Sequence, residues 1–278
     1  MTNSVHTNVA AAIALQNLTR TNERLGDVQN RISTGLKIQG AKDNAAIWAI
    51  AQGQRADVGA LGAVKQSLDR ATSIADVALS AGESVSDLLI QLKEKVVAAK
   101  DTSLGTQSRQ LLDSDFKALL RAIGSAVQNA AFDGGNILNG SLTVGIEFLA
   151  NADASSTITL SAKNLSLGGS IITLSLTDSL LTTTGASTAL TKLDASLTQL
   201  NAALGEIGSQ AKQIAAHKTF VSKLMDTLES GIGNLVDADL AKESARLQAL
   251  QVQQQLGAQS LSIANQAPQI ILSLFRGG

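Results

Sequence analysis

The chain has 278 residues, with 22 Lys and Arg against 23 Asp and Glu, no cysteine, one proline and 2% aromatic residues. Without cysteine it can form neither a disulfide framework nor a cysteine-ligated zinc site. The net charge of −1 and the few aromatic rings argue against a nucleic-acid-binding protein, which needs basic and stacking surfaces.

The first predicted element is a helix near the N-terminus. Residues on one helical face recur at steps of three and four, and all but one are apolar: Ala11, Ala14, Leu18, Thr21, Leu25, Val28 and Ile32. Gly35 and Gly40 interrupt the pattern, so residues 33–40 are predicted to be a linker. Asp43 and Asn44 have the short polar side chains that cap a following helix.

Two long stretches then carry heptad spacing. The first comprises Leu61, Val64, Leu68, Ala71, Ala75, Ala78, Gly82, Val85, Leu89, Leu92, Val96 and Ala99. The second comprises Leu190, Leu193, Leu197, Leu200, Leu204, Ile207, Ala211, Ile214, Lys218, Val221, Met225, Leu228, Ile232 and Leu235. A 3.5-residue repeat keeps one face toward a partner helix, so we predict long helices that pair as an antiparallel coiled coil.

The middle of the chain changes character. A shorter helix is predicted over residues 103–131, and the glycines of segment 132–135 end it. Between residues 140 and 180, apolar and polar side chains alternate in three short runs, which predicts two or three strands. Residues 177–188 are rich in Ser and Thr and are predicted to form a loop.

The C-terminal stretch, residues 239–275, is helical by pattern, and we expect Pro268 to bend or interrupt it. The predicted fold is therefore mainly α. It consists of a long antiparallel coiled-coil hairpin or bundle with a small β region in the middle and with the N- and C-terminal helices paired.

Catalytic and ligand-binding motifs are missing from the sequence. His6 and His217 are isolated, whereas a metal site needs several converging ligands. Neither a phosphate-binding loop nor a Gly-x-Ser-x-Gly elbow occurs. Acidic pairs such as Asp113/Asp115 and Asp237/Asp239 are predicted to be helix caps and surface charges. We therefore predict no enzyme, no cofactor and no metal.

Membrane and secretion signals are also missing. No apolar run reaches 18 residues, so no membrane span is predicted. The first residues lack the basic and apolar regions of a Sec signal peptide.

Both ends of the chain carry apolar residues on more than one helical face. Chain ends are normally solvated, so this pattern indicates burial in an assembly or a disordered segment that awaits one. The residues predicted to contact other subunits are Leu15, Leu18, Leu25, Ile32, Leu250, Leu256, Leu261, Ile263, Ile270, Leu272, Leu274 and Phe275.

Several motifs resemble a known family. Residues 30–38 with 41–46 resemble the N-terminal signature of bacterial flagellins, and residues 132–135 with 137–140 resemble the family's turn between helix and β region. Residues 234–244, and residues 264–269 leading to 272–276, resemble the C-terminal signature. Trp48 and the short middle are similar to compact alphaproteobacterial flagellins. The matched signature residues are Asn30, Arg31, Gly35, Ala41, Asp43, Ala45, Asn139, Gly140, Asn234, Asp239 and Asn265.

The resemblance implies a structural subunit that polymerises into the extracellular flagellar filament used for motility. It implies an inner domain of residues 1–39 with 237–278 and a coiled-coil rod domain of residues 40–236. It also implies several partners: other copies and other flagellins, hook-associated junction and cap proteins, the type III export apparatus, and a chaperone that covers residues 256–275 before export.

The family resemblance also points to an immune-receptor segment at residues 89–96. Gln91 stands where an arginine is expected, between Leu89 and the flanking Lys93 and Glu94. Because an amide cannot replace a planar fork of donors, the resemblance implies weakened recognition.

Three alternatives stay open at this point. The chain could be a flagellar junction or cap protein with the same terminal helices, or a non-flagellar secreted coiled-coil protein. The hydroxyls of residues 155–188 could carry O-linked sugars, as in some flagellins, or belong to an ordinary solvated loop.

Overall fold

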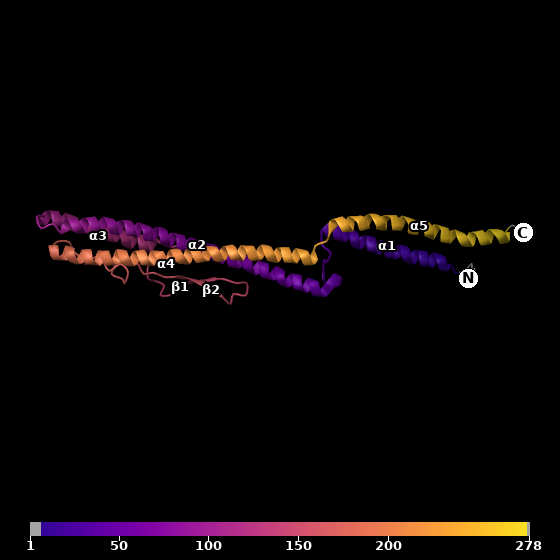
Figure 1. The fold of residues 1–278 in the computed structure, drawn as a ribbon, viewed down its shortest axis with the longest axis horizontal. Coiled ribbons are helices and arrows are strands. Elements are labelled where there is room, and N and C mark those ends of the chain that lie inside the picture. Colours follow the sequence, from indigo (N-terminus) through magenta and orange to yellow (C-terminus); the bar gives the residue numbers. More distant parts are fainter. Residues whose placement is uncertain (1–6, 277–278) are drawn as a thin grey trace. The chain divides into compact units, whose positions relative to one another are not determined.

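The computed structural model describes the backbone of residues 7–276 and the side chains of residues 7–266. The mainly α prediction is confirmed (Figure 1). In chain order the elements are α1 (Val9–Thr34), α2 (Ala41–Ala99), α3 (Thr106–Asn129), β1 (Gly145–Leu149), β2 (Thr157–Ser161), α4 (Thr183–Val236) and α5 (Leu240–Arg276).

The chain divides into two compact units, and the helices α2 and α4 contribute to both. Unit 1 combines residues 1–56 with residues 228–278, and unit 2 comprises residues 57–227. The domain boundaries predicted at residues 39 and 237 refer to roles in an assembly, and they stay a prediction.

Unit 2 is built on the predicted heptad residues. Leu68 and Leu89 of α2 and Leu200 and Ile207 of α4 are fully buried, as is Phe116 of α3, which lies outside the two heptad series. Aliphatic side chains at this spacing form a continuous seam along antiparallel helices, and burying each such side chain contributes about 1.5–3 kcal/mol. The core therefore needs few aromatic rings.

Side-chain contacts set the register between α2 and α4. Lys93 Nζ lies 2.7 Å from Asp194 Oδ1, and Lys218, the one charged residue in the second heptad series, pairs with Asp69. Gly82 faces Leu204 so closely that a Cβ there would collide with the leucine side chain. These contacts place increasing residue numbers of α2 opposite decreasing numbers of α4, as expected for an antiparallel pair.

The β region is a single antiparallel hairpin whose register pairs Gly145 with Ser161 and Leu149 with Thr157. Hydrogen bonds attach it to the helices of unit 2. The backbone N–H of Leu149 donates to Ser67 Oγ (3.2 Å), and the N–H of Ser161 donates to Gln210 Oε1 (2.9 Å). His217 Nε2 lies 2.7 Å from the carbonyl oxygen of Ala150, so the imidazole of this α4 residue has a hydrogen-bond partner within the chain.

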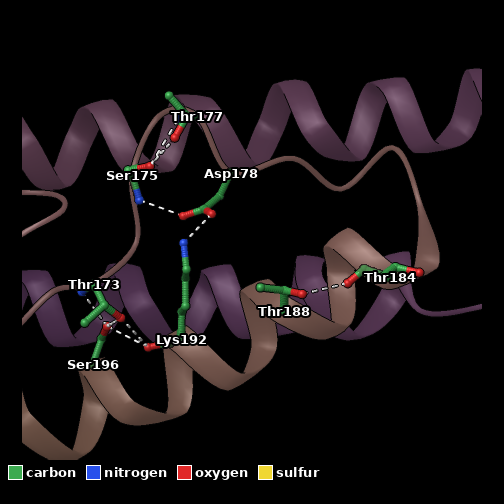
Figure 2. Close-up of polar contacts among 8 residues, drawn as sticks. All are labelled: Thr173, Ser175, Thr177, Asp178, Thr184, Thr188, Lys192 and Ser196. Carbon is green, nitrogen blue, oxygen red and sulfur yellow. Dashed lines mark hydrogen bonds and ion pairs between the residues drawn. The ribbon is translucent and has the colours of Figure 1, made fainter.

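Residues 172–176, the third alternating run, form no strand. Ile172 and Leu174 are buried as the alternation predicts, but the chain lies along α4 instead of pairing with a strand. The N–H of Thr173 donates to Ser196 Oγ, and the N–H of Ser175 donates to Asp178, whose carboxylate pairs with Lys192 Nζ at 2.6 Å (Figure 2). Side chains of α4 and of the loop itself thus accept the backbone hydrogen bonds that a neighbouring strand would otherwise accept.

The start of α4 and the course of α5 at Pro268 differ from the predictions. Helix α4 begins at Thr183, inside the predicted loop, because Thr182 Oγ1 accepts a hydrogen bond from the N–H of Gly185 and caps the helix. Helix α5 continues past Pro268 to Arg276, so the helix is not broken there, since a proline removes only one helical hydrogen bond and can be accommodated. The bend expected at Pro268 stays a prediction.

The prediction for Asp113 as a cap or surface charge is wrong. Its buried carboxylate accepts hydrogen bonds from the N–H of Leu180 (2.7 Å) and from Ser179 Oγ (3.0 Å), and it pairs with Lys117. Burial acts to raise the pKa of Asp113, but the hydrogen bonds from Lys117, Leu180 and Ser179 prevail and lower this pKa below its ordinary value of 3.8. Asp113 therefore fastens the loop before α4 to α3.

Replacing Asp113 should destabilise unit 2. Asp113→Ala leaves the Leu180 N–H and the Ser179 hydroxyl without an acceptor, so we expect the free energy of unfolding in urea to fall by about 1–3 kcal/mol at pH 7. The exposed Asp115, which pairs with Lys95, provides the matched control, and Asp115→Ala should change stability by less than about 0.5 kcal/mol.

The same pair of variants has a defined pH dependence. Because the folded pKa of Asp113 lies below its unfolded value, its stabilisation is present above about pH 4 and is lost as the pH falls further. The stability gap between wild type and Asp113→Ala should therefore shrink below about pH 4. A gap that stays constant down to pH 2 would contradict this role.

Candidate assembly site

The two signature segments, about 200 residues apart in sequence, meet in unit 1. The N–H of Lys37 donates to the carbonyl oxygen of Val236 (2.8 Å), and the N–H of Ala238 donates to that of Gly35 (2.8 Å). Leu36 and Asp237 form an isolated antiparallel bridge. We call residues 35–40 with 236–239 the joint, because they connect α1 to α2 and α4 to α5.

Glycine is required at the first position of the joint. Gly35 ends α1 in the left-handed conformation (φ 72°), and its N–H donates to the carbonyl oxygen of Arg31 at 2.9 Å. A residue with a Cβ is disfavoured there, whereas glycine adopts this conformation freely. The turn that directs the chain toward Val236 thus depends on a signature residue.

The polar signature residues cap the helices on either side of the joint, as predicted. Asp43 Oδ2 accepts hydrogen bonds from the N–H groups of Gln39 (2.9 Å) and Gly40. Asn44 is extended, and its Oδ1 accepts from the N–H of Ile47, which starts the long part of α2. Asp239 Oδ1 accepts from the N–H of Lys242 at the start of α5.

An ion-pair cluster beside the joint includes a residue that the sequence analysis did not single out. Glu243 is buried, and its Oε1 lies 3.6 Å from Arg31 Nη1 and 3.1 Å from Arg246 Nη1. Arg31 is in the last turn of α1 and Glu243 is in the first turn of α5. Each charge therefore interacts favourably with the dipole of its own helix. The sequence signal was a carboxylate four residues before Leu247, on the helix face that Leu250 and Leu261 continue, but its partner Arg31 could be identified only from the structure.

Beyond the joint, α1 and α5 lie side by side as an antiparallel pair (Figure 1). The amide of Asn8 donates to the carbonyl oxygen of Ala264 (2.7 Å), and that of Gln254 donates to Asn22 Oδ1 (2.8 Å). Gly257 leaves room for Leu18, whose Cδ1 would lie 3.2 Å from a Cβ at that position. The helix face predicted from sequence, Ala11 to Ile32, is the face that α1 turns toward α5.

The predicted assembly residues fall into two groups. Those along the α1–α5 seam are half-buried within the chain: Leu18, Leu25, Ile32, Leu250 and Leu261. Leu15, Leu256 and Ile263 lie outside the seam with 54%, 56% and 67% of their surface exposed. Val9, Ile13 and Val252 share this exposure although they were not singled out. Ile270, Leu272, Leu274 and Phe275 lie outside the described side chains.

The remaining signature residues occupy varied positions. Asn139 Oδ1 accepts from the N–H of Ser141, and Gly140 has φ 77° where a Cβ would lie 2.7 Å from the Asn164 side chain. The carbonyl oxygen of Asn234 accepts from Lys37 Nζ (3.2 Å). Ala41 and Ala45 flank the caps of α2, while Asn30 and Asn265 are exposed.

The candidate receptor segment lies in α2, in unit 2. Gln91, Lys93 and Glu94 are exposed, and the pair of Lys93 with Asp194 ties one of these side chains to α4. Leu89 and Leu92 point into the core. The exposed part of this segment is thus an amide, a paired lysine and a carboxylate.

The described part of the chain shows little that suggests ligand chemistry. A groove of about 420 Å³ runs between α1 and α5, lined by Arg24, Asp27, Val28, Arg246, Ala249, Leu250 and Gln253. Among the described residues, no group of His, Asp and Glu converges as metal ligands would. Within the same residues, no helix is long and apolar enough to cross a bilayer.

Comparisons with known proteins match both halves of the chain. The model of the bacterial flagellin N-terminal helical region matches residues 5–143, and that of the C-terminal helical region matches residues 190–275. The chain is 56% identical to flagellin FljJ of Caulobacter vibrioides and 41% identical to a flagellin of Brucella melitensis, each over 99% of both chains.

Two solved structures share the fold. Bacillus cereus flagellin superposes with a TM-score of 0.50 at 22% identity, covering 56% of this chain and 88% of that one. A Vibrio parahaemolyticus protein provisionally classed as flagellar hook-associated gives a TM-score of 0.58 at 12% identity, covering 70% of this chain and all of that one. At these identities the likeness concerns the fold alone.

A substitution at the joint should loosen it selectively. Gly35→Ala places a Cβ in the left-handed region at a cost of about 1 kcal/mol, so the amides of Lys37 and Ala238 should exchange with solvent roughly five times faster. Gly26→Ala in α1, where a Cβ meets nothing within 4 Å, is the control and should not accelerate exchange. Equal exchange in both variants would contradict the role of Gly35.

Proposed function

The chain belongs to the bacterial flagellins, the subunits that polymerise into the extracellular flagellar filament, and from this premise we propose that its α1–α5 pair forms the inner, subunit-binding domain of the filament. In this proposal residues 1–39 with 237–278 form that domain, and residues 40–236 form the coiled-coil domain outside it.

The exposed apolar side chains of α1 and α5 carry this proposal. Leu15, Leu256 and Ile263 are each more than half exposed. They lie on stretches without any charged residue, residues 7–19 and 247–266. Soluble monomers rarely leave such surfaces uncovered, and a helical polymer formed by heterologous contacts would cover them with identical surfaces of neighbouring copies.

The two groups of assembly residues have different roles in this proposal. Leu18, Leu25, Ile32, Leu250 and Leu261 hold α1 and α5 together, so that the pair presents a defined surface. Leu15, Leu256 and Ile263 contact the neighbouring copies directly. Ile270, Leu272, Leu274 and Phe275 would extend the same contact along α5.

The filament role is favoured over the junction or cap role by sequence coverage. The 56% identity to a flagellin extends over 99% of both chains, whereas the hook-associated protein is 12% identical and similar in fold alone. Hook-associated junction and cap proteins are then partners at the two ends of the polymer. The joint and seams serve assembly, and we propose no catalytic role for the chain.

The partners before assembly follow from the family. We propose that a chaperone covers residues 256–275 in the cytoplasm and that the type III export apparatus transports the chain. The exposed Leu256 and Ile263 support this, because a partner that covers them would prevent premature contact between copies.

Ile263→Asp tests the direct contacts. Since Ile263 is 67% exposed, the variant monomer should keep its helical content, while an unpaired charge buried between copies should abolish filaments in electron micrographs. Asn201→Asp adds the same charge on the exposed surface of α4 and should leave filaments intact. Leu261→Asp should also block assembly, but by separating α1 from α5.

Gln91→Arg tests the receptor segment. We expect the wild-type chain to activate the innate immune receptor weakly in reporter cells, because the Gln91 amide offers fewer donors than a guanidinium. Gln91→Arg should increase potency, while Lys100→Arg, an exposed change outside the segment, should not. Wild-type potency equal to that of an arginine-bearing flagellin would contradict the expectation.

A further inference from the structure

An outward face of α2 in unit 2 has no role in the fold described above. Its residues recur at steps of three and four, and all are exposed. We call this face the acidic row; it consists of Asp76, Ser80, Glu83, Asp87, Ile90, Glu94 and Val97. At heptad spacing the row drifts around α2 by only about 20° per seven residues, so a second helix that coils around α2 could contact all of it.

The four carboxylates of the acidic row lie along one face of α2 without ion pairs. None of Asp76, Glu83, Asp87 and Glu94 pairs with a described residue, whereas several carboxylates elsewhere on the unit, such as Asp69 and Asp194, pair with lysines. Ile90 and Val97, each 51% exposed, lie among these charges. The row thus combines unpaired negative charge with two apolar side chains.

Helix α4 carries a complementary outward face, which we call the lysine row. Its exposed members are Gly205, Ser209, Lys212, Ala216, Thr219 and Lys223. Lys212 and Lys223 form no ion pair with any described residue, and the row members between them, Ala216 and Thr219, have small side chains, with the exposed Phe220 at the edge of the row. The two lysines are eleven residues apart, as are Glu83 and Glu94. This spacing corresponds to roughly 16 Å along a helix.

We propose that the acidic row of one copy packs against the lysine row of a neighbouring copy in the filament. The inference rests on the proposed polymer and identifies a second contact, in unit 2, besides that of α1 and α5. Glu83 pairs with Lys223 and Glu94 pairs with Lys212. Ile90 then packs over Ala216, and Val97 over Ser209, where small side chains leave space.

The direction of the two rows supports this register. Because α2 and α4 are antiparallel within one copy, they are also antiparallel between copies that share one orientation, as heterologous polymer contacts require. The parallel alternative, with Glu83 at Lys212, would place the apolar Val97 opposite Asp226. The antiparallel register places Val97 opposite Ser209 and Asp226 opposite the polar Ser80, so the shared orientation of the copies and the fit of the apolar side chains favour it.

The register has a geometric consequence. Within one copy, Lys93 of α2 lies opposite Asp194 of α4. In the proposed contact between copies, Lys93 lies level with residue 213 in α4 of the neighbour. The difference of nineteen residues corresponds to an axial offset of roughly 28 Å between the two copies at 1.5 Å per residue. A helical reconstruction of the filament measures this offset directly.

Charge reversal and its rescue test the contact in the full-length chain. The reversed variant carries Glu83→Lys and Glu94→Lys, and the swapped variant adds Lys212→Glu and Lys223→Glu. The control carries Asp57→Lys and Glu147→Lys, exposed positions outside both rows that change the net charge equally. The critical concentration for polymerisation is measured by sedimentation after seeding, and circular dichroism checks the fold of each monomer.

We expect the reversed variant to need at least roughly a tenfold higher concentration to polymerise, because like charges then face each other. The swapped variant should return to near the wild-type value and the control should stay there, with the offset near 28 Å in wild-type filaments. An unchanged critical concentration in the folded reversed variant, no rescue by the swap, or a clearly different offset would overturn the contact but not the filament function. Failure of the wild-type chain to polymerise would overturn both.

Discussion

The rest of this protein depends on one interaction, the antiparallel pairing of helices through aliphatic seams of heptad spacing. The paired helices come from the N-terminal and C-terminal halves of the chain. Both long pairs, α2 with α4 and α1 with α5, join segments more than 80 residues apart in sequence. Each pair brings residues into contact that have no local reason to meet. The hairpin, the loop before α4 and the joint are all attached to helices positioned in this way.

The two units cover their seams to different extents. In unit 2, α3 and the hairpin add further surfaces to the α2–α4 pair, and seam residues such as Leu89 and Ile207 are fully buried. In unit 1 the α1–α5 seam has only two helices, and Leu25 and Leu250 stay half-buried. A two-helix pair buries too little apolar surface to offset its conformational entropy comfortably, which supports the proposal that neighbouring copies cover it.

The charged residues of unit 1 are distributed unevenly along its helices. The joint and the adjoining turns hold the ion pairs of unit 1, where Arg31 and Arg246 converge on Glu243. Farther from the joint, residues 7–19 and 247–266 contain no charged residue at all. Burying a charge between copies costs far more than burying an amide, so a charge-free surface is suited to repeated self-contact. In unit 2 the charges without an ion pair among the described residues include the acidic row on α2 and two lysines on α4.

The sequence by itself determined the helices, their seams, the caps at Asp43, Asn44 and Asp239, and the family. Heptad spacing and capping depend on neighbours in the chain, so they can be read without knowing what lies opposite. Only the tertiary structure decided that Asp113 and Glu243 are buried, that Leu261 faces α1 while Ile263 does not, and that residues 172–176 lie along α4 without forming a strand. Each of these depends on which distant segment packs against the residue, and a periodic pattern specifies a face without specifying its partner.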